Sequence, residues 1–486
     1  MEPSAQHVDT HTGHVVVIGG GIAGLAAAHR LLGAGIDVTL LEATGRLGGK
    51  LYAGQIEGAP VDLGAESMLA RRPEAVELAR AVGLGGLLQP PATATASVWT
   101  RGELRPMPKG HVMGVPGDPA ALAGLLSEEG LARIAREPEL PPTEVGDDVS
   151  VGAYVAERLG REVVDRLVEP LLGGVYAGDA YRISMKSAVP QLFEALKSHH
   201  SLLESVRALQ AEAAAAQRSA GEAGAGAVFA GIEGGVGRLP GAVADAVRAG
   251  GGRIRMESPV LGLTRTADRW RIRTDREVLS ADGVVLAAPA WSAAALLADE
   301  SPAASAELAG IEYASMALVT MAFRRADADA LPDGSGFLVP PVDGHTIKAS
   351  TFSTRKWRWV ADAAPDLFLL RTSIGRYGEE ERVHQDDADL VEVSLSDLGE
   401  ATGLTARPVA TEVTRWIDGL PQYPVGHQAR VARIREAVAK LPGLRVCGAP
   451  YDGVGIPACV ASARRAADEI IATSTLAWGT GRGAGE

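Results

Sequence analysis

The stretch that decides the fold is HVVVIGGGIAG, residues 14–24. Its first five residues form a β-branched run, its last six are rich in glycine, and an Ala- and Leu-rich segment follows as far as Leu32. These patterns predict a strand, a tight turn and a helix. A second apolar run at 37–42 predicts the next strand and completes a β-α-β unit.

The glycines of this loop have the G-x-G-x-x-G spacing of a dinucleotide-binding turn. Gly19 permits the turn, Gly21 lets the backbone approach a pyrophosphate, and Gly24 lets the helix pack against the strand. Glu42 follows close to the ~20-residue spacing expected of a carboxylate that binds ribose hydroxyls. The contacts predicted here are Gly19, Gly20, Gly21, Ile22, Ala23, Gly24, Glu42 and Ala43.

The segment EATGRLGGK, residues 42–50, distinguishes FAD from NAD as the cofactor. A cation and two glycines just after the ribose carboxylate suit a second approach of backbone to a diphosphate. The spacing resembles flavoproteins of the amine oxidase and desaturase group. The resemblance implies FAD and contacts at Arg46, Gly49 and Lys50. Lys50 stands where many relatives carry Arg, and a lysine cannot make the bidentate contact.

Two further stretches resemble flavin segments of the same group. DLGAES at 62–67 resembles the loop beneath the flavin ring, and GVGIP at 453–457 resembles the C-terminal flavin segment, although an ordinary helix-entry turn is its plain alternative. A helix starting there would direct positive potential at the pyrimidine end and stabilise the anionic reduced flavin. The implied contacts are Gly64, Ala65, Glu66, Ser67, Val260, Trp416, Gly448, Val454, Gly455 and Ile456.

The most distinctive stretch is EPLLGGVYAGD, residues 169–179. With MPKG at 107–110, GVP at 114–116 and the motifs between 415 and 427, it resembles the protoporphyrinogen/coproporphyrinogen oxidase family, over roughly 14–471. The match is nearest to its Gram-positive branch. The resemblance implies oxidation of coproporphyrinogen III to coproporphyrin III by dioxygen, giving hydrogen peroxide, in haem biosynthesis; protoporphyrinogen IX is the alternative substrate.

The family also implies the architecture. It is an α/β fold with α+β inserts: a discontinuous Rossmann-type FAD domain, a mixed-sheet substrate domain and an inserted helical domain, as in amine oxidases. The predicted FAD domain comprises 12–84, 228–296 and 441–476, with the substrate domain beginning near 50–62. The other predicted parts are a helical domain with substrate-domain segments (85–205, with one helix over 151–172), a flexible connection (206–227) and the substrate domain (297–440).

Because the implied substrate carries propionates, basic residues are expected at the rim of its pocket. Arg72 is the preferred partner, and Arg71 and Lys109 are further candidates; a solvated surface turn is the plain alternative for the two arginines. No general base is nominated, because aromaticity of the product drives the reaction. No residues have metal-ligand spacing.

Composition limits the other possibilities. The 486 residues carry a net charge of −13, which disfavours nucleic-acid binding and polybasic membrane binding. The two cysteines form no C-x-x-C motif, and no apolar stretch has the length of a membrane span. We expect a cytoplasmic protein with at most weak peripheral membrane contact and, from the pathway, transient contact with a coproporphyrin ferrochelatase. An amine oxidase, a carotenoid desaturase and a non-catalytic FAD-containing porphyrin carrier stay open.

Overall fold

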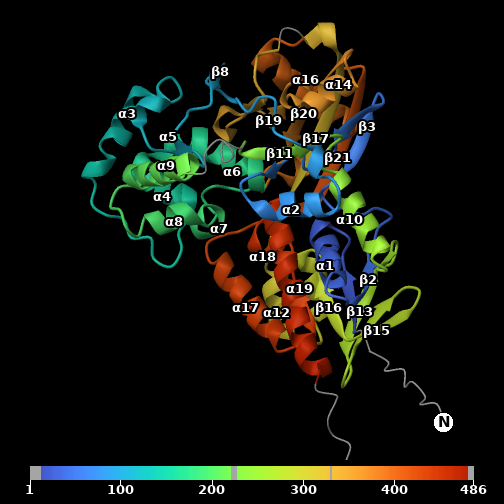
Figure 1. Cartoon of the computed structure of the whole chain (residues 1–486). Coiled ribbons are helices and arrows are strands. Elements are labelled where there is room, and N and C mark those ends of the chain that lie inside the picture. The colour runs from blue at the N-terminus through green and yellow to red at the C-terminus, as the bar shows by residue number, and fades with distance from the viewer. Residues whose placement is uncertain (1–12, 220–226, 329–330, 480–486) are drawn as a thin grey trace, which may run out of the picture.

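The computed structural model describes residues 13–219, 227–328 and 331–479. Figure 1 shows three parts: an α/β layer at the bottom, a mixed sheet at the upper right and a group of helices at the left. The chain passes repeatedly between them, so each part is built from segments that are distant in sequence.

Five parallel strands form the sheet of the α/β part, in the order β12-β2-β1-β16-β22. Their bounds are β1 (His14–Ile18), β2 (Asp37–Leu41), β12 (Arg253–Arg255), β16 (Gly283–Leu286) and β22 (Leu444–Val446). Since helices cover both faces, β1, β2 and β16 are almost entirely buried and apolar. The predicted β-α-β unit and the discontinuous α/β domain are confirmed.

Each face of this sheet has its own apolar core. One face carries α1 (Ile22–Leu32), α2 (Pro73–Ala81), α10 (Arg238–Ala249) and α19 (Ile456–Gly479). The other carries α11 (Ala290–Leu297), α12 (Pro302–Ala309), α17 (His427–Ala439) and the meander β13 (Val260–Arg265), β14 (Trp270–Thr274) and β15 (Val278–Ala281). Buried alanines on α1 and α19 let these two helices pack closely against one another and the sheet.

The mixed sheet has seven strands in the order β21-β17-β20-β19-β18-β7-β8, antiparallel except for the β18–β7 pair. Their bounds are β7 (Ser97–Thr100), β8 (Glu103–Pro106), β17 (Tyr313–Arg324), β18 (Gly336–Leu338), β19 (Ile347–Thr351), β20 (Leu367–Ile374) and β21 (Ala410–Pro421). Helix α16 (Asp387–Thr402) covers one face. Of the stretch 297–440, helices α12 and α17 pack on the parallel sheet and not on this one.

Short elements connect these parts. The strand pairs and the small sheet are β3 (Ala53–Ile56) with β4 (Ala59–Asp62), β9 (His111–Val112) with β10 (Val115–Pro116), and β5 (Met68–Leu69), β11 (Phe229–Ile232) and β6 (Leu88–Gln89). The short helices are α13 (Ser353–Lys356), α14 (Arg358–Ala363), α15 (Glu380–Val383) and α18 (Ala449–Asp452). Within the described residues, no helix is long and apolar enough to cross a membrane.

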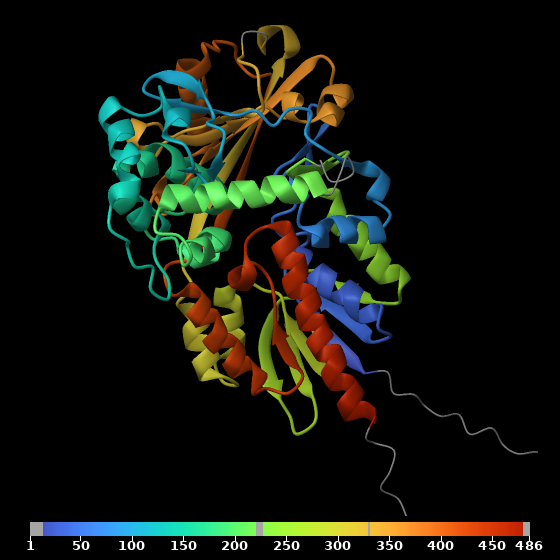
Figure 2. The ribbon, with the colours of Figure 1, turned by 60° about the vertical axis from the view of Figure 1, so that its left-hand side comes forward.

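The helical part has a separate core. Its helices are α3 (Glu128–Ala135), α4 (Val151–Leu159), α5 (Arg161–Val163), α6 (Glu169–Tyr176), α7 (Met185–Ala188), α8 (Pro190–Ala195) and α9 (Leu202–Ser219), which runs across the molecule in Figure 2. The single helix predicted over 151–172 is wrong, because Gly160 at φ +95° ends α4. Of the predicted connection at 206–227, residues 206–219 belong to α9, and residues 220–226 lie outside the described residues.

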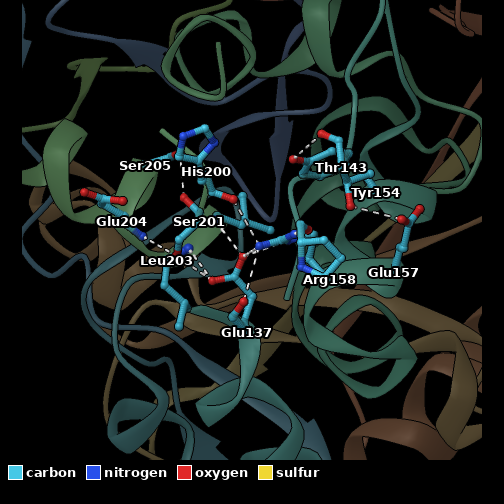
Figure 3. A network of polar contacts seen from close by, with 12 residues as sticks. Glu137, Thr143, Tyr154, Glu157, Arg158, His200, Ser201, Leu203, Glu204 and Ser205 are labelled. Carbon is cyan, nitrogen blue, oxygen red and sulfur yellow. Dashed lines mark hydrogen bonds and ion pairs between the residues drawn. The ribbon is translucent and has the colours of Figure 1, made fainter. Parts of the chain in front are cut away.

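A buried ion pair fixes the start of α9 (Figure 3). Glu137 and Arg158 are almost completely inaccessible to solvent and bind each other directly. Glu137 also accepts hydrogen bonds from the Ser201 hydroxyl at 2.5 Å and from the Leu202 N–H at 2.7 Å. Arg158 donates to the carbonyl of Pro141 at 2.5 Å. The network therefore satisfies both buried charges and the otherwise free N–H groups of the first turn.

Candidate flavin and substrate site

The glycine loop lies at the carboxyl end of β1. Gly19 has φ +111°, and a Cβ there would lie 2.7 Å from the Ala287 carbonyl oxygen; a Cβ on Gly24 would overlap the carbonyl oxygen of Gly19. Gly21 differs, because its Cβ would meet nothing within 4 Å. The loop thus leaves open space at the glycine predicted to face a pyrophosphate, next to the N-terminus of α1.

Glu42 lies at the edge of this loop. Its Oε2 accepts the Gly20 N–H at 2.7 Å, and its Oε1 accepts the N–H and the hydroxyl of Thr44, each at 2.8 Å. The half-buried carboxylate is thereby held beside the cradle, with about one acceptor site left for a ribose hydroxyl. Ala43 is exposed beside it.

The second glycine turn closes against the first. The Gly48 N–H donates to the Gly20 carbonyl at 2.8 Å, and a Cβ on Gly49 would lie 3.4 Å from the Gly21 Cα. This contact between two glycine turns was beyond sequence reasoning, although each turn was recognised. Together they form a surface without side chains, as a diphosphate requires.

The two predicted cations of this turn have different surroundings. Arg46 donates to the carbonyls of Gly49 at 2.5 Å and Leu47 at 3.1 Å, and its guanidinium lies 4.3 Å from the Tyr52 ring centroid. Lys50 has no side-chain hydrogen bond or ion pair to any described residue. Burial lowers the pKa of Lys50, and the nearby Cys459 thiol opposes this shift. Arg46 therefore braces the loop, whereas the Lys50 ammonium is left for a bound group.

Lys50 lies between two of the predicted flavin segments and the start of α19. It directly follows the Gly48–Gly49 turn, and its carbonyl accepts the Ala65 N–H at 3.0 Å from the loop at 62–67. Burial raises the pKa of Cys459 to about 12, while Lys50 and Arg72 lower it, so both cations lie near this thiol on α19. The Gly48–Gly49 turn, the loop at 62–67 and the first turn of α19 therefore lie around Lys50.

The loop at 62–67 is held by charged residues of the mixed sheet and its flanking helix. Arg371 donates to the Gly64 carbonyl at 2.6 Å and lies 3.3 Å from Glu66 Oε2, and Lys356 binds the other oxygen of Glu66. Burial raises the pKa of Glu66, but Arg371 and Lys356 more than offset it and hold the pKa below its usual value. The carboxylate of Glu66 is thus used within the protein. Sequence reasoning missed Arg371 and Lys356, which carry no local motif.

Of the remaining predicted cofactor residues, Trp416 packs against this loop. Trp416 Nε1 donates to the Leu63 carbonyl at 3.3 Å, and a Cβ on Gly64 would lie 3.1 Å from the Trp416 ring. Asp62 accepts the N–H groups of Val236 at 3.0 Å and Gly237 at 2.8 Å, and its burial raises its pKa to about 7. The other positions are half-buried Ala65 and Ser67, Val260 at the start of β13, buried Gly448, half-buried Val454, exposed Gly455, and Ile456, which begins α19.

The predicted substrate residues are not all brought together. Arg71 and Arg72 are exposed immediately before α2, and Arg72 forms an ion pair of 2.8 Å with Glu74. Lys109 is exposed on the segment between β8 and β9, away in sequence from the turn that carries the two arginines. Helix α2, which follows Arg72, packs against α19, and Arg464 on α19 pairs with Glu77 on α2 at 2.7 Å.

The EPLLGGVYAGD stretch joins the helical part to the mixed sheet. Its helix α6 ends at Ala177, which has φ +48° and whose carbonyl accepts the Tyr377 N–H at 2.7 Å. Glu169 Oε2 accepts the Ala180 N–H at 2.7 Å and so closes the turn after the helix. Burial raises the pKa of Glu169 to about 7. The described residues contain no group of three or more His, Cys, Asp or Glu side chains arranged to hold a metal.

Two glycine turns meet beside the N-terminus of α1, with the Glu42 carboxylate at their edge. This arrangement, next to the loop at 62–67, is that of a flavoprotein that binds a dinucleotide. The chain belongs to the family of flavin-containing amine oxidoreductases, which it matches over residues 22–471. The cofactor is FAD, whose adenosine diphosphate fits the Gly21 opening and Glu42. The predicted family, fold class and cofactor are confirmed.

Particular relatives are more specific. The chain is 34% identical to the coproporphyrinogen III oxidase of Bacillus subtilis, over 94% of this chain and 98% of the relative. It is 36% identical to the coproporphyrinogen III oxidase of Mycobacterium tuberculosis, over 94% and 96%. It also resembles the crystal structure of a "Putative protoporphyrinogen oxidase" from Exiguobacterium, with a TM-score of 0.83 and 34% identity over 95% of this chain and 99% of that one.

Proposed function

We propose that this protein oxidises coproporphyrinogen III to coproporphyrin III with dioxygen, releasing hydrogen peroxide, in haem biosynthesis. The observation that carries the proposal is its similarity, over almost the whole chain, to enzymes named coproporphyrinogen III oxidase from both bacilli and mycobacteria. The conversion removes six electrons, so the enzyme completes three two-electron cycles for each substrate molecule.

When bound, FAD would accept the hydride from the substrate, and dioxygen would reoxidise the reduced cofactor. The protein's own groups bind and orient. The glycine turns and Glu42 hold the dinucleotide, while Arg371 fixes the loop at Gly64 and Trp416 packs against it. Lys50 and the start of α19 direct positive potential into the same region. The assignment of cofactor contacts to the predicted residues is part of the proposal.

The propionates of the substrate are assigned to cations at the rim. Arg72 is the preferred partner, because α2, which it precedes, packs against α19, and its ion pair within the described residues is with the half-buried Glu74. Arg71 adds charge on the same turn, and Lys109 is a more distant candidate. Such exposed cations give binding and orientation rather than chemistry.

Protoporphyrinogen IX is the alternative substrate, and the name of the similar Exiguobacterium structure favours it. We further propose a cytoplasmic location, at most weak peripheral membrane contact, and transient transfer of product to a coproporphyrin ferrochelatase. The amine oxidase and desaturase alternatives predict bleaching of the flavin by an amine or a carotenoid precursor without oxygen. The carrier alternative predicts no peroxide above autoxidation.

The test is aerobic turnover by purified, yellow protein with each porphyrinogen separately. Porphyrin fluorescence and peroxide are followed against an enzyme-free control. Faster formation of coproporphyrin, with peroxide, supports the proposal. Preference for protoporphyrinogen IX overturns the substrate but keeps the reaction, and failure with both overturns the proposal.

A further inference from the structure

A lysine lies buried in the mixed sheet without a carboxylate partner. Lys348, on β19, is 4% exposed. Its Nζ donates to the Gly375 carbonyl at 2.9 Å and lies 3.9 Å from the Met316 sulfur. Neither acceptor neutralises an ammonium, so a charge is costly here and a neutral amine is not. A methionine or leucine would fill this place at lower cost, which points to a functional reason for the amine.

Backbone irregularities at one end of the sheet bring the amine to this position. The β19–β20 pairing shifts register at 347–349, and the β17–β21 pairing shifts at 314–316. Gly375 follows β20 at φ +97°, and a Cβ there would lie 2.7 Å from the Ser315 carbonyl oxygen. Bulges re-aim side chains and are frequent beside active sites. Here they point Lys348 across β20 to Met316.

Met316 connects this lysine with the flavin loop. It pairs across the sheet with Trp416, whose Nε1 donates to the Leu63 carbonyl next to Gly64. Met316 is half-buried, whereas Lys348 behind it is buried. The flexible side chain of Met316 therefore lies between the Lys348 amine and the part of the sheet that carries Trp416.

The charges around the amine favour its neutral form. Burial and then the Arg376 guanidinium lower the pKa of Lys348 to about 7, and Glu379 acts in the opposite direction. Arg376 is itself 7% exposed and donates to the Val339 carbonyl at 3.2 Å. The charged groups that face this cation pair are Glu379 and Arg382 after β20, Glu169 on α6 and Asp397 on α16.

We infer that Lys348 is the proton acceptor of the oxidation, an inference that rests on the proposed function. In each cycle a C–H bond of the porphyrinogen breaks and its hydride goes to the bound flavin. In two of the three cycles a pyrrole N–H breaks with its electron pair staying on nitrogen. In the remaining cycle the proton comes from the fourth bridging carbon, and the electron pair of that C–H bond forms the last double bond of the conjugated ring. Each proton goes to the Lys348 lone pair once Met316 turns aside. The ammonium returns this proton to water before the next cycle. A lysine desolvated beside another cation is suited to this role at neutral pH.

The test compares Lys348→Met and Lys348→Arg holoenzymes with wild type in coproporphyrinogen III turnover from about pH 5.5 to 9. Wild-type kcat should fall on the acid side near pH 7. Asp62 and Glu169 also titrate near this pH, so the acid limb alone identifies no residue. Both variants should lose the limb and at least about a hundredfold in kcat, because neither side chain accepts a proton there. Rates are normalised to bound flavin.

A second measurement does not depend on turnover. Wild-type stability should rise relative to Lys348→Met between about pH 7 and 10, because the unfolded lysine keeps a proton that the folded one has lost. A difference in melting temperature that is constant over this range would overturn the inference. If the Met variant does not fold, Lys348→Gln takes its place.

The control is Lys440→Met, since Lys440 is exposed and forms only an i,i+4 ion pair of 3.4 Å with Glu436. It should keep the wild-type profile. Either Lys348 variant retaining the wild-type rate and acid limb overturns the role of Lys348. Wild type that oxidises neither porphyrinogen contradicts the proposed function instead, so the two failures are distinguishable.

Discussion

The FAD cradle and the helical part are held together by opposite means. In the cradle, two glycine turns are joined by a hydrogen bond between backbone groups. The Gly48 N–H donates to the Gly20 carbonyl, and neither residue has a side chain. In the helical part, one buried ion pair between Glu137 and Arg158 ties a turn, a loop and the start of α9 together. Side-chain atoms added to the cradle should block the cofactor. Side-chain atoms removed from the charged network should leave a buried charge without its partner. Substitutions should therefore fail in opposite directions in the two regions.

Adding atoms to the cradle should have the largest effect. Gly21 has φ −69°, which any residue adopts, and a Cβ there meets nothing within 4 Å, so a side chain at this position starts in open space without backbone strain. The valine of Gly21→Val should occupy the place of the pyrophosphate. We expect folded, colourless protein with less than about a tenth of the wild-type flavin, measured by absorbance near 450 nm.

Gly241→Val is the matched control, because Gly241 on α10 also has nothing within 4 Å of its Cβ but lies outside the cradle. It should remain yellow. Yellow Gly21→Val protein with normal flavin content would refute the placement of the cofactor.

Removing atoms from the network should have the next largest effect. Glu137→Ala leaves the guanidinium of Arg158 buried without its carboxylate, which typically costs about 3–5 kcal/mol. Urea unfolding should show this loss in the free energy of unfolding, while the protein that remains folded keeps its flavin. Glu139→Ala is the control, since Glu139 is exposed on the same turn and should change little. Equal stability of both variants would show that the network is not what holds the helical part.

The same contrast explains what the sequence could predict. The segments of the cradle are short contiguous motifs, so Gly19–Gly24, Glu42 and the 62–67 loop could be recognised from the sequence. Arg371 and Lys356 reach that loop across some 300 residues, and nothing in their own neighbours marks them. A helix break at Gly160 was equally hidden, because its flanks keep helical periodicity. Long-range charge pairing depends on the completed fold, and local patterns do not contain it.

A titrating carboxyl tests the joint between the helical part and the mixed sheet. Burial raises the pKa of Glu169 from 4.5 to about 7, so the folded state prefers the neutral form. The contribution of Glu169 to stability is therefore complete below about pH 4.5 and is lost as the pH rises through 7. Glu169→Gln, which keeps an acceptor for the Ala180 N–H, should match wild type near pH 4.5. It should be more stable by ~3 kcal/mol at pH 8, as measured by urea unfolding. A stability difference that does not change with pH would contradict this account.

The smallest effect is expected at the rim, where charges are neither buried nor close-packed. Arg72→Ala removes an exposed cation whose ion pair with Glu74 adds little stability, so the melting temperature should not change. If Arg72 binds a propionate, KM for coproporphyrinogen III should rise about three- to tenfold while kcat stays within about twofold.

Arg248→Ala is the matched control, with an equally exposed arginine paired to Asp245, and should alter neither constant. Arg71→Ala should raise KM less than Arg72→Ala does, because Arg71 is assigned only added charge on the same turn. An unchanged KM in Arg72→Ala would remove this residue from the substrate site and leave propionate binding to cations elsewhere, with Lys109→Ala as the next variant to measure.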